Sequence, residues 1–321
     1  MTSYYAYRSA RLEQLEARED GCWIQLCPPF VVDELKDLAA RHDLPLDFLT
    51  DPLDTDERSR YQREEADRLI VVNTPVLSTV EGSEEANEGI YVTVPLGIII
   101  TPRNVITITS NENHPVLRLF SENKIKNVDP QQQAKFVLRI LENTVYRYLT
   151  CLKRLNIKRN LIEQELYDSS RNRELKQLLS IEKSLVYFIN ALNGNELLKA
   201  KMKRTDFLII RHDEDLTDLF EDIIIDNGQA LEMANIYTNI LNGTMDAYGS
   251  IISNNLNITI QRLTLITIVL TVPMVVASFF GMNVAVPFQG ESNLFAFLAI
   301  ILISVLLSFG TIYYFRRQRM F

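Results

Sequence analysis

The sequence is poor in the residues that most enzyme sites and structural metal sites use. Of 321 residues only three are histidines and three are cysteines, Cys22, Cys27 and Cys151. The cysteines are odd in number and lack the spacing of a metal site, so they are interpreted as core residues in a reducing compartment. His-Glu-x-x-His, Gly-x-Ser-x-Gly and Walker A sequences are all missing. The sequence therefore argues against an enzyme, and no organic cofactor is expected.

Two further absences limit the partners and the location of the chain. The net charge is -8 and no basic stripe offsets it, which argues against nucleic acid as a partner. Residues 1–10 contain no basic region followed by an apolar core, so no cleavable signal peptide is expected. The large N-terminal part is therefore predicted to lie in the cytoplasm.

Long apolar runs are present, and they lie near the C-terminal end. No charged residue occurs from Leu263 to Phe280 or from Leu294 to Phe315. Each run is long enough to cross about 30 Å of hydrocarbon as a helix. A pair of buried core helices is the alternative, which the length and closeness of the two runs disfavour. Two transmembrane helices in a lipid membrane are predicted.

The distribution of arginine predicts the orientation of these spans. Arg262 precedes the first span, and Arg316, Arg317 and Arg319 follow the second, whereas the connector over residues 281–293 has no lysine or arginine. Positive residues favour the cytoplasmic side. The sequence thus predicts a multi-pass protein of the cell (inner) membrane with both termini in the cytoplasm.

The rest of the chain changes from short mixed elements to long helices. Residues 21–27, 69–75, 90–101 and 105–110 are rich in Ile, Val and Thr and are predicted strands, with a short helix over 31–40. Asp129-Pro130 is typical of a helix start, and long helices are predicted over 131–166, over 172–192 before Gly194, and continuously over 213–281. The expected fold class is an α+β cytoplasmic domain, an α/β sandwich plus long helices, with two C-terminal transmembrane helices.

Seven segments follow from this pattern. They are an α/β domain over 1–128, a long-helix region over 129–212, a stalk over 213–262, a pore-lining span over 263–283, an extracytoplasmic loop over 284–293, a second span over 294–315 and a basic cytoplasmic tail over 316–321.

One face of the first span is mostly polar. Thr264, Thr267, Thr271 and Ser278 follow one another at helical spacing, with Met274 in the gap. Continued toward the N-terminus, the same face carries Ile260, Asn257, Ser253, Ser250 and Asp246. Threonine and serine in membrane helices also bond back to the preceding turn without any pore. The shared register with Asn257 and Asp246 favours a pore lining instead, and because two spans cannot enclose a pore, it predicts a cyclic homo-oligomer.

Such a lining suits a divalent cation. Hydroxyl and carboxamide oxygens can hydrogen-bond the water shell of Mg2+, which sheds water reluctantly. Ile260 and Met274 would form apolar constrictions that gate by dewetting. Entry of two charges gains about 4.6 kcal/mol per 100 mV, so the membrane potential can drive uptake without ATP.

The end of the first span carries Gly281-Met282-Asn283, preceded by Pro273 and followed by a short loop, a second span and a basic tail ending Arg316-Arg317-Gln318-Arg319. In this position the tripeptide resembles the signature of the CorA family of magnesium and cobalt transporters. The resemblance implies a funnel-shaped homopentamer whose filter for hydrated Mg2+ is Asn283, held by Gly281 and Met282.

The same resemblance assigns further positions by counting back from the signature. It implies pore-facing roles for Thr271, Thr267, Leu263, Ile260 and Asn257, and an acidic ring at the inner mouth for Asp246. It also places a regulatory carboxylate at Asp222, in an acidic run with Asp218, where cytosolic Mg2+ would bridge two subunits and hold the channel shut. A solvated helical face is the alternative for these acids.

Two alternatives remain open. The family's outer loop usually carries carboxylates near the signature, whereas here residues 284–289 are uncharged and only Glu291 is acidic. The transported ion is therefore Mg2+ first, with Co2+, Ni2+ or Zn2+ as alternatives. A non-conducting, membrane-tethered helical scaffold would explain the long helices but gives the hydroxyl stripe and Asn283 no role.

Overall fold

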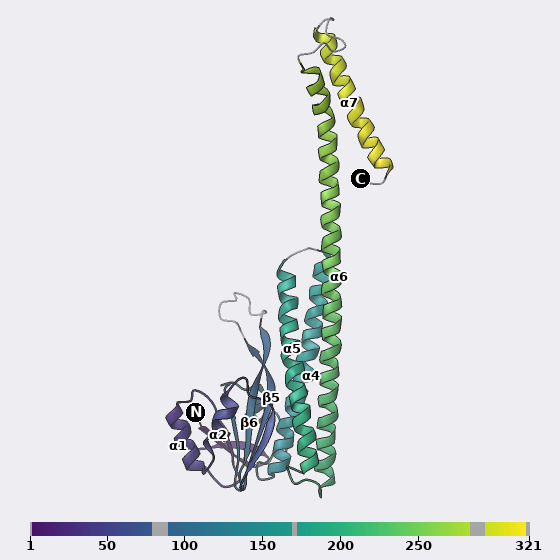
Figure 1. The fold of residues 1–321 in the computed structure, drawn as a ribbon. Helices are drawn as coiled ribbons and strands as arrows, with labels where there is room; N and C mark the ends of the chain where they lie inside the picture. Colours follow the sequence, from purple (N-terminus) through teal and green to yellow (C-terminus); the bar gives the residue numbers. More distant parts are fainter. Residues whose placement is uncertain (1, 79–88, 169–171, 283–292, 319–321) are drawn as a thin grey trace. The chain divides into compact units, whose positions relative to one another are not determined.

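The computed structural model describes residues 2–78, 89–168, 172–282 and 293–318 (Figure 1). The chain divides into two compact units, Met1–Met245 (unit 1) and Asp246–Phe321 (unit 2). The strands are β1 (Thr2–Arg8), β2 (Arg11–Leu15), β3 (Trp23–Leu26), β4 (Arg60–Glu64), β5 (Asp67–Ser78), β6 (Ile90–Ile100) and β7 (Val105–Thr109). The helices are α1 (Val32–His42), α2 (Leu46–Thr50), η1 (Asp51–Leu53), α3 (Pro115–Ser121), α4 (Gln133–Asp168), α5 (Asn172–Thr205), α6 (Glu214–Phe280) and α7 (Asn293–Arg317).

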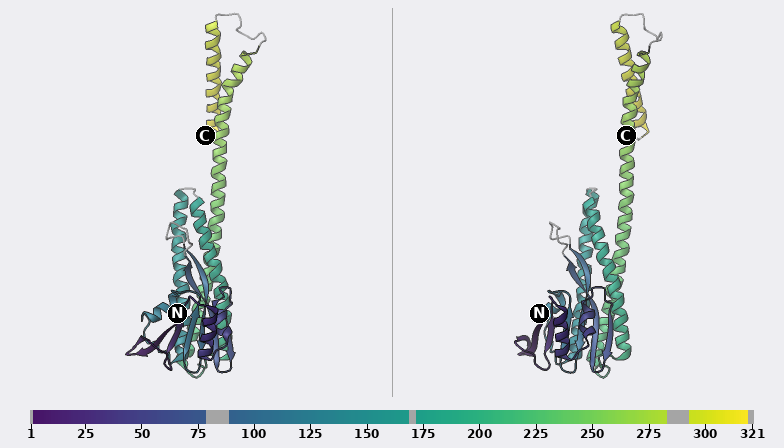
Figure 2. Two further views of the ribbon diagram at one scale, coloured as in Figure 1. Left: turned by 90° about the vertical axis from the view of Figure 1, so that its left-hand side faces the viewer. Right: turned by 60° about the vertical axis from the view of Figure 1, so that its left-hand side comes forward.

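Unit 1 is built on one seven-stranded mixed sheet in the order β2-β1-β3-β7-β6-β5-β4. β3 and β7 pair in parallel, and the other neighbours pair antiparallel. Successive side chains of a strand point to opposite faces. Accordingly Ile70 and Val72 enter the core on the α4/α5 side, while Leu69 and Val71 enter a second core with α1 and α2. Figure 2 shows these layers, and the α/β sandwich is confirmed.

The sequence missed three strands. β1, β2 and β4 carry half-exposed or charged side chains, and β2 and β4 are the two edge strands. Edge strands have no need of a continuous apolar run, because one side of each faces solvent. The patterns of β2 and β4 were therefore too polar to stand out from the surrounding turns, whereas β1 is an inner strand whose residues Thr2 to Tyr7 are only half-buried.

The predicted end of the second long helix at residue 192 is wrong. α5 continues through Gly194 to Thr205. A glycine inside a helix costs about 1 kcal/mol relative to alanine. This cost is offset because Leu198 and Met202 lie beyond the glycine and are buried in the main core of unit 1.

A side chain takes the place of a neighbouring strand beside β5, just beyond the first residue of β4. β4 begins at Arg60, opposite Val71, so β5 has no strand partner beside Asn73 on that edge. There the Asn73 N–H donates to Asn195 Oδ1 at 3.1 Å, and Asn195 Nδ2 donates to the Asn73 carbonyl at 2.9 Å. Asn195 is fully buried on α5. Its carboxamide thus copies the pairing of a strand and fixes α5 to the sheet.

A buried lysine fixes α5 to the part of α6 that belongs to unit 1. Lys199 Nζ donates to Asn227 Oδ1 at 2.6 Å, and Asn227 Nδ2 donates to the Leu192 carbonyl at 3.1 Å. Both side chains are fully buried. Burial lowers the pKa of Lys199 to about 7, and nearby Glu196 opposes that shift.

His114 forms the start of α3 rather than a plain turn. Its Nδ1 accepts from the Leu117 N–H at 3.4 Å, and its Nε2 lies 2.6 Å from Thr74 Oγ1. Because Thr74 Oγ1 donates to the Val94 carbonyl, the geometry fits a neutral ring that donates from Nε2. Burial lowers the pKa of His114 from 6.5 to about 3.

We expect His114 to make the fold sensitive to acid. Between pH 6.5 and about 3 the unfolded chain binds more protons at this residue than the folded chain. Folding stability should fall with decreasing pH in that window, by about 1.4 kcal/mol per pH unit from this residue. His114→Asn keeps a capping side chain but cannot titrate, so its stability should depend less on pH. Unfolding followed by the fluorescence of Trp23, the single tryptophan, measures both slopes, and equal slopes would contradict the assignment.

Candidate functional site

The polar stripe predicted from the sequence lies on α6 in unit 2, and all of its members are exposed in the single chain. They are Asn257, Ile260, Leu263, Thr264, Thr267, Thr271, Met274 and Ser278. Asp246, at the start of unit 2, is also exposed. α6 is one uninterrupted helix despite Pro273, as predicted.

The opposite face of α6 is the covered one. Leu265 is 3% exposed, and Val269, Val272 and Val276 are partly covered. Consecutive helical residues are turned by about 100°, so a residue two positions further on lies about 200° around the helix. Thr267, Thr271, Met274 and Ser278 each stand two positions after one of these covered residues. The stripe therefore points away from the packed side of the helix.

The packed side of α6 borders a groove that it shares with α7. Pro273 and Ala277 of α6 and Ile301, Ser304 and Ser308 of α7 are among the residues around this cavity of about 470 Å³. No member of the polar stripe lines it. Within unit 2, α7 thus lies beside the apolar side of α6 and leaves the stripe uncovered.

The threonines of the stripe bond back to their own helix. Thr264, Thr267 and Thr271 donate their hydroxyl protons to the carbonyls of Ile260, Leu263 and Thr267 at 2.8, 2.9 and 2.8 Å. Such back-bonding is what the interpretation without a pore predicted for these residues. A hydroxyl oxygen also has two acceptor lone pairs, and donation to a carbonyl leaves both available. These three threonines therefore present hydrogen-bond acceptors on the stripe.

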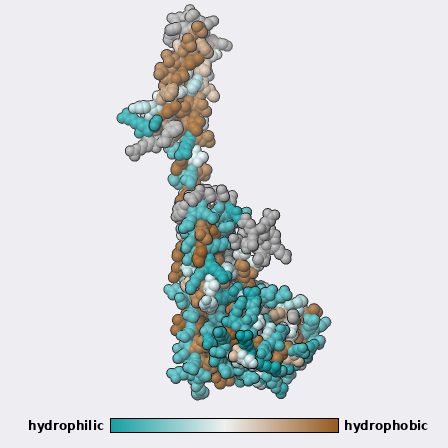
Figure 3. Space-filling view, turned by 180° about the vertical axis from the view of Figure 1, so that it is seen from behind, coloured by the Kyte–Doolittle hydropathy of each residue, from teal (hydrophilic) through white to brown (hydrophobic). Residues whose placement is uncertain are grey.

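Both apolar helices are long enough to span a membrane, and their apolar windows are almost wholly uncovered. Only 6% of the window in α6 and none of that in α7 is buried. Core helices would be mostly buried, so the core-helix alternative is wrong. Figure 3 shows apolar side chains gathered over these helices, whereas the surface of unit 1 is mostly hydrophilic.

The end of α6 is described only as far as Met282. The Gly281 N–H donates to the Ala277 carbonyl at 2.9 Å, and the Met282 N–H donates to the Phe279 carbonyl at 3.4 Å, so the backbone continues in a bonded turn. Met282 is exposed. Asn283, Glu291 and Arg319 lie outside the described residues, so the filter role of Asn283 stays a prediction.

The predicted regulatory acids lie on an exposed part of α6 in unit 1. Asp218 and Asp222 are exposed, whereas their neighbour Glu221 is bound to Lys203 at 2.7 Å. In the described part of the chain, no three His, Cys, Asp or Glu side chains are grouped closely enough to hold a metal ion. A metal site at Asp222 would thus need ligands other than the described side chains of this single chain.

The structure brings together residues that sequence reasoning missed. A cavity between the sheet and α5 holds Arg58 and Lys201, which are far apart in the sequence and belong to no motif. The buried Lys199–Asn227 pair was missed for a similar reason. Lys199 lies among exposed basic neighbours, and only packing against α6 distinguishes it.

Comparison with known proteins identifies relatives along almost the whole chain. Residues 19–317 match a family model described as CorA-like Mg2+ transporter protein. The "Cobalt/magnesium transport protein CorA" of Methanocaldococcus jannaschii is 26% identical over 300 residues, covering 92% of this chain and 90% of the relative.

Two solved structures share the fold. The complete CorA magnesium transporter from M. jannaschii superposes with a TM-score of 0.79 at 23% identity, covering 99% of this chain and 98% of that one. The ZntB cytoplasmic domain from Vibrio parahaemolyticus has a TM-score of 0.57 at 9% identity, covering 78% of this chain and 98% of that one. These likenesses concern the fold, with unit 1 and both C-terminal helices included in the first.

Proposed function

Because this chain belongs to the CorA-like Mg2+ transporter family, and so is a divalent cation transporter rather than an enzyme, we propose that it conducts Mg2+ along the polar stripe of α6. The resemblance suggested by the sequence is confirmed, and the chain is a membrane protein with two C-terminal spans. The observation that carries the pathway is the exposure of the stripe opposite the covered face of α6.

The pathway requires several copies of the chain. Two helices cannot surround a channel, so one copy of the chain cannot form the pathway. If copies of α6 were arranged around an axis, their stripes would line a water-filled pore and α7 would lie outside it. We infer a homopentamer, as the resemblance implies, with both termini in the cytoplasm.

Ion choice would be set at the outer end of the pathway. Gly281 and Met282 continue the chain from α6 in a bonded turn, which would present Asn283 as a ring of carboxamides to the hydrated ion. Mg2+ fits such a ring because it keeps its waters. Co2+ is a second cargo, in keeping with the name of the M. jannaschii relative, and transport of Zn2+ or Ni2+ is the alternative.

Both the driving force for ion uptake and the regulation of the channel would be electrostatic. Uptake would be driven by the membrane potential, with Asp246 concentrating cations at the inner mouth. Asp222 and Asp218 are exposed, and their side chains make no ion pair or hydrogen bond within the described residues. Cytosolic Mg2+ would bridge Asp222 to a neighbouring subunit and hold the channel shut, because facing carboxylates otherwise repel.

Flux into liposomes tests the function. Purified full-length protein is reconstituted with an inside-negative potential, and uptake of Mg2+, Co2+, Ni2+ and Zn2+ is measured. We expect Mg2+ uptake, and we expect Asn283→Ala to change its rate or its ion preference by about tenfold or more. Asn254→Ala removes an exposed carboxamide of α6 outside the stripe and should have little effect.

Each remaining outcome discriminates between the alternatives. Uptake of Zn2+ or Ni2+ in preference to Mg2+ would favour the alternative cargo. An absence of flux for all four ions, from protein shown to be inserted and oligomeric, would support the non-conducting scaffold.

A further inference from the structure

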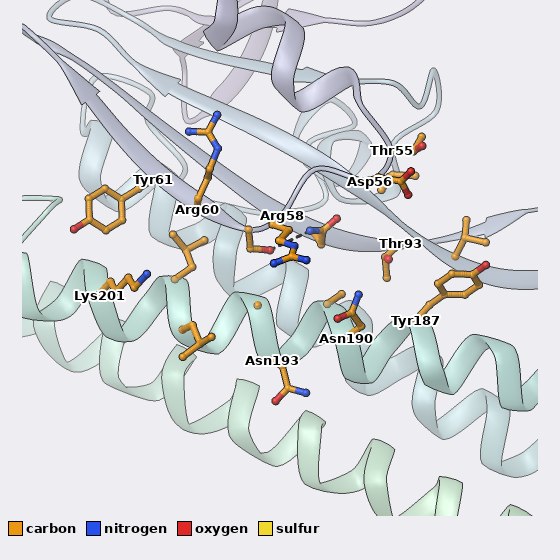
Figure 4. Close-up of a pocket in the computed structure, with 18 residues that line it drawn as sticks. Thr55, Asp56, Arg58, Arg60, Tyr61, Thr93, Tyr187, Asn190, Asn193 and Lys201 are labelled. Carbon is orange, nitrogen blue, oxygen red and sulfur yellow. Dashed lines mark hydrogen bonds between the residues drawn. The ribbon is translucent and has the colours of Figure 1, made fainter.

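A large cavity lies between the sheet of unit 1 and α5, far in sequence from the ion pathway. Its volume is about 1120 Å³. One wall comes from the segment before β4, from β4 and from β6, and the other is one face of α5 that includes Tyr187, Asn190 and Lys201. Figure 4 shows Arg58 extending from the sheet side over the middle of α5. A cavity of this size exceeds what a single ion or a few waters require.

The floor of the cavity is rigid and its hydrogen bonds are used internally. Ser59 Oγ donates to Asn195 Oδ1 at 2.7 Å, and Asn73 Nδ2 donates to Ser59 Oγ at 3.1 Å. Asn195 in turn holds the backbone of Asn73. These groups shape the cavity, but they have little capacity left to bind a ligand.

Two cations on the walls are uncommitted. Arg60 is bound by Asp51 and Glu57, so its charge is already compensated. Arg58 and Lys201 make no side-chain hydrogen bond or ion pair within the described residues, although both line the cavity. Asp56 is the one carboxylate among the residues that line it. With Asp56 and the two carboxylates on Arg60, the walls are balanced in charge overall, and Arg58 and Lys201 are the groups left to bind an anion.

The cavity also offers an aromatic surface. Tyr61 packs against Phe207 with ring centroids 4.4 Å apart, and its hydroxyl donates to Thr205. Tyr187 is 46% exposed and has no ring partner in the described part of the chain. Figure 4 places Tyr187 and Lys201 toward opposite ends, with Arg58 between them. Exposed tyrosines can stack on planar rings such as nucleobases.

We propose that this cavity binds a nucleotide-sized organic phosphate, with Arg58 and Lys201 holding the phosphate groups and Tyr187 stacking on the ring system. Arginine and lysine are the usual phosphate partners, and their bonds to phosphate are charge-assisted. The volume accommodates both parts of such a molecule. The site is independent of the proposed ion pathway, and its binding is measured without transport.

Binding to full-length protein in detergent tests the proposal. Isothermal titration calorimetry in buffer freed of divalent ions compares ADP, tripolyphosphate and inorganic phosphate, so that no metal–phosphate complex contributes. We expect ADP to bind, and Arg58→Gln/Lys201→Gln to weaken it by about tenfold or more. The matched control Arg63→Gln/Arg204→Gln removes two exposed cations of β4 and α5 that do not line the cavity, and it should bind like wild type.

Tyr187→Ala tests the binding of the ring system separately from the binding of the phosphate groups. It should weaken ADP binding and leave tripolyphosphate binding unchanged. The proposal is overturned if ADP fails to bind, if the Arg58/Lys201 variant keeps wild-type affinity, or if the control loses as much. Inorganic phosphate or tripolyphosphate binding as tightly as ADP would also overturn it, as a simple anion site. Lys201→Gln alone replaces the double variant if the latter changes the oligomeric state on size-exclusion chromatography.

Discussion

Replacing Asn195 by leucine is expected to lower the free energy of unfolding by about 3 kcal/mol. The change leaves the buried N–H of Asn73 without its acceptor and takes the acceptor of the Ser59 hydroxyl away as well. The Asn73 carbonyl keeps its second partner, the hydroxyl of Tyr148 at 3.0 Å, which limits the loss. Denaturant unfolding followed by the fluorescence of Trp23 reports on this unit, because Trp23 is fully buried in its core.

A neighbour on the same helix supplies the control for Asn195. Asn193 is exposed, and its Nδ2 donates only to the Ile189 carbonyl of α5 at 2.9 Å. Asn193→Leu should change stability by less than about 0.5 kcal/mol. If both variants lost the same stability, the strand-like pairing of Asn195 with Asn73 would not be what holds α5 on the sheet.

Replacing Thr267 by valine is expected to reduce Mg2+ flux by about tenfold or more, because the change repeats in every subunit around the pathway. Valine keeps the shape of threonine and removes the hydroxyl. Thr311 on α7 is a close structural match, since its Oγ1 donates to the Leu307 carbonyl at 2.8 Å, as that of Thr267 does to Leu263 at 2.9 Å. Thr311→Val should leave the flux unchanged.

The two valine variants decide what the threonines are for. If back-bonding within the helix were their whole role, the two changes would have equal and small effects, because the lost bond is the same. A large effect at Thr267 alone supports the lining. Potential-driven uptake into liposomes, with insertion and oligomeric state checked for each variant, gives the comparison.

The sequence predicted the helices best where signals were local and repeated. The start of α4 after Asp129-Pro130 and the length of α6 followed from caps and from the lack of breakers, and the structure agrees within a few residues. The end of α5 did not follow, since Gly194 is tolerated only because Leu198 and Met202 are buried beyond it. Tertiary packing of this kind leaves no mark in a single sequence.

The same division holds for the sites. The stripe of α6 was visible because its members recur on one helix at fixed spacing, and the structure places them on one exposed face. Asn195 gave no signal, because its partner Asn73 lies on β5, 122 positions away. Arg58 and Lys201 are likewise joined only by the approach of α5 to the sheet.

The back-bonded threonines of α6 have a consequence for the sign of the ions that the proposed pathway admits. A hydroxyl that has given its proton to a carbonyl presents only lone pairs. Water around a cation directs its hydrogens outward and meets such a wall with complementary bonds, whereas water around chloride needs donors that the wall does not supply. Thr264, Thr267 and Thr271 would thus reject anions through the direction of their hydrogen bonds, without a formal charge in the hydrocarbon region.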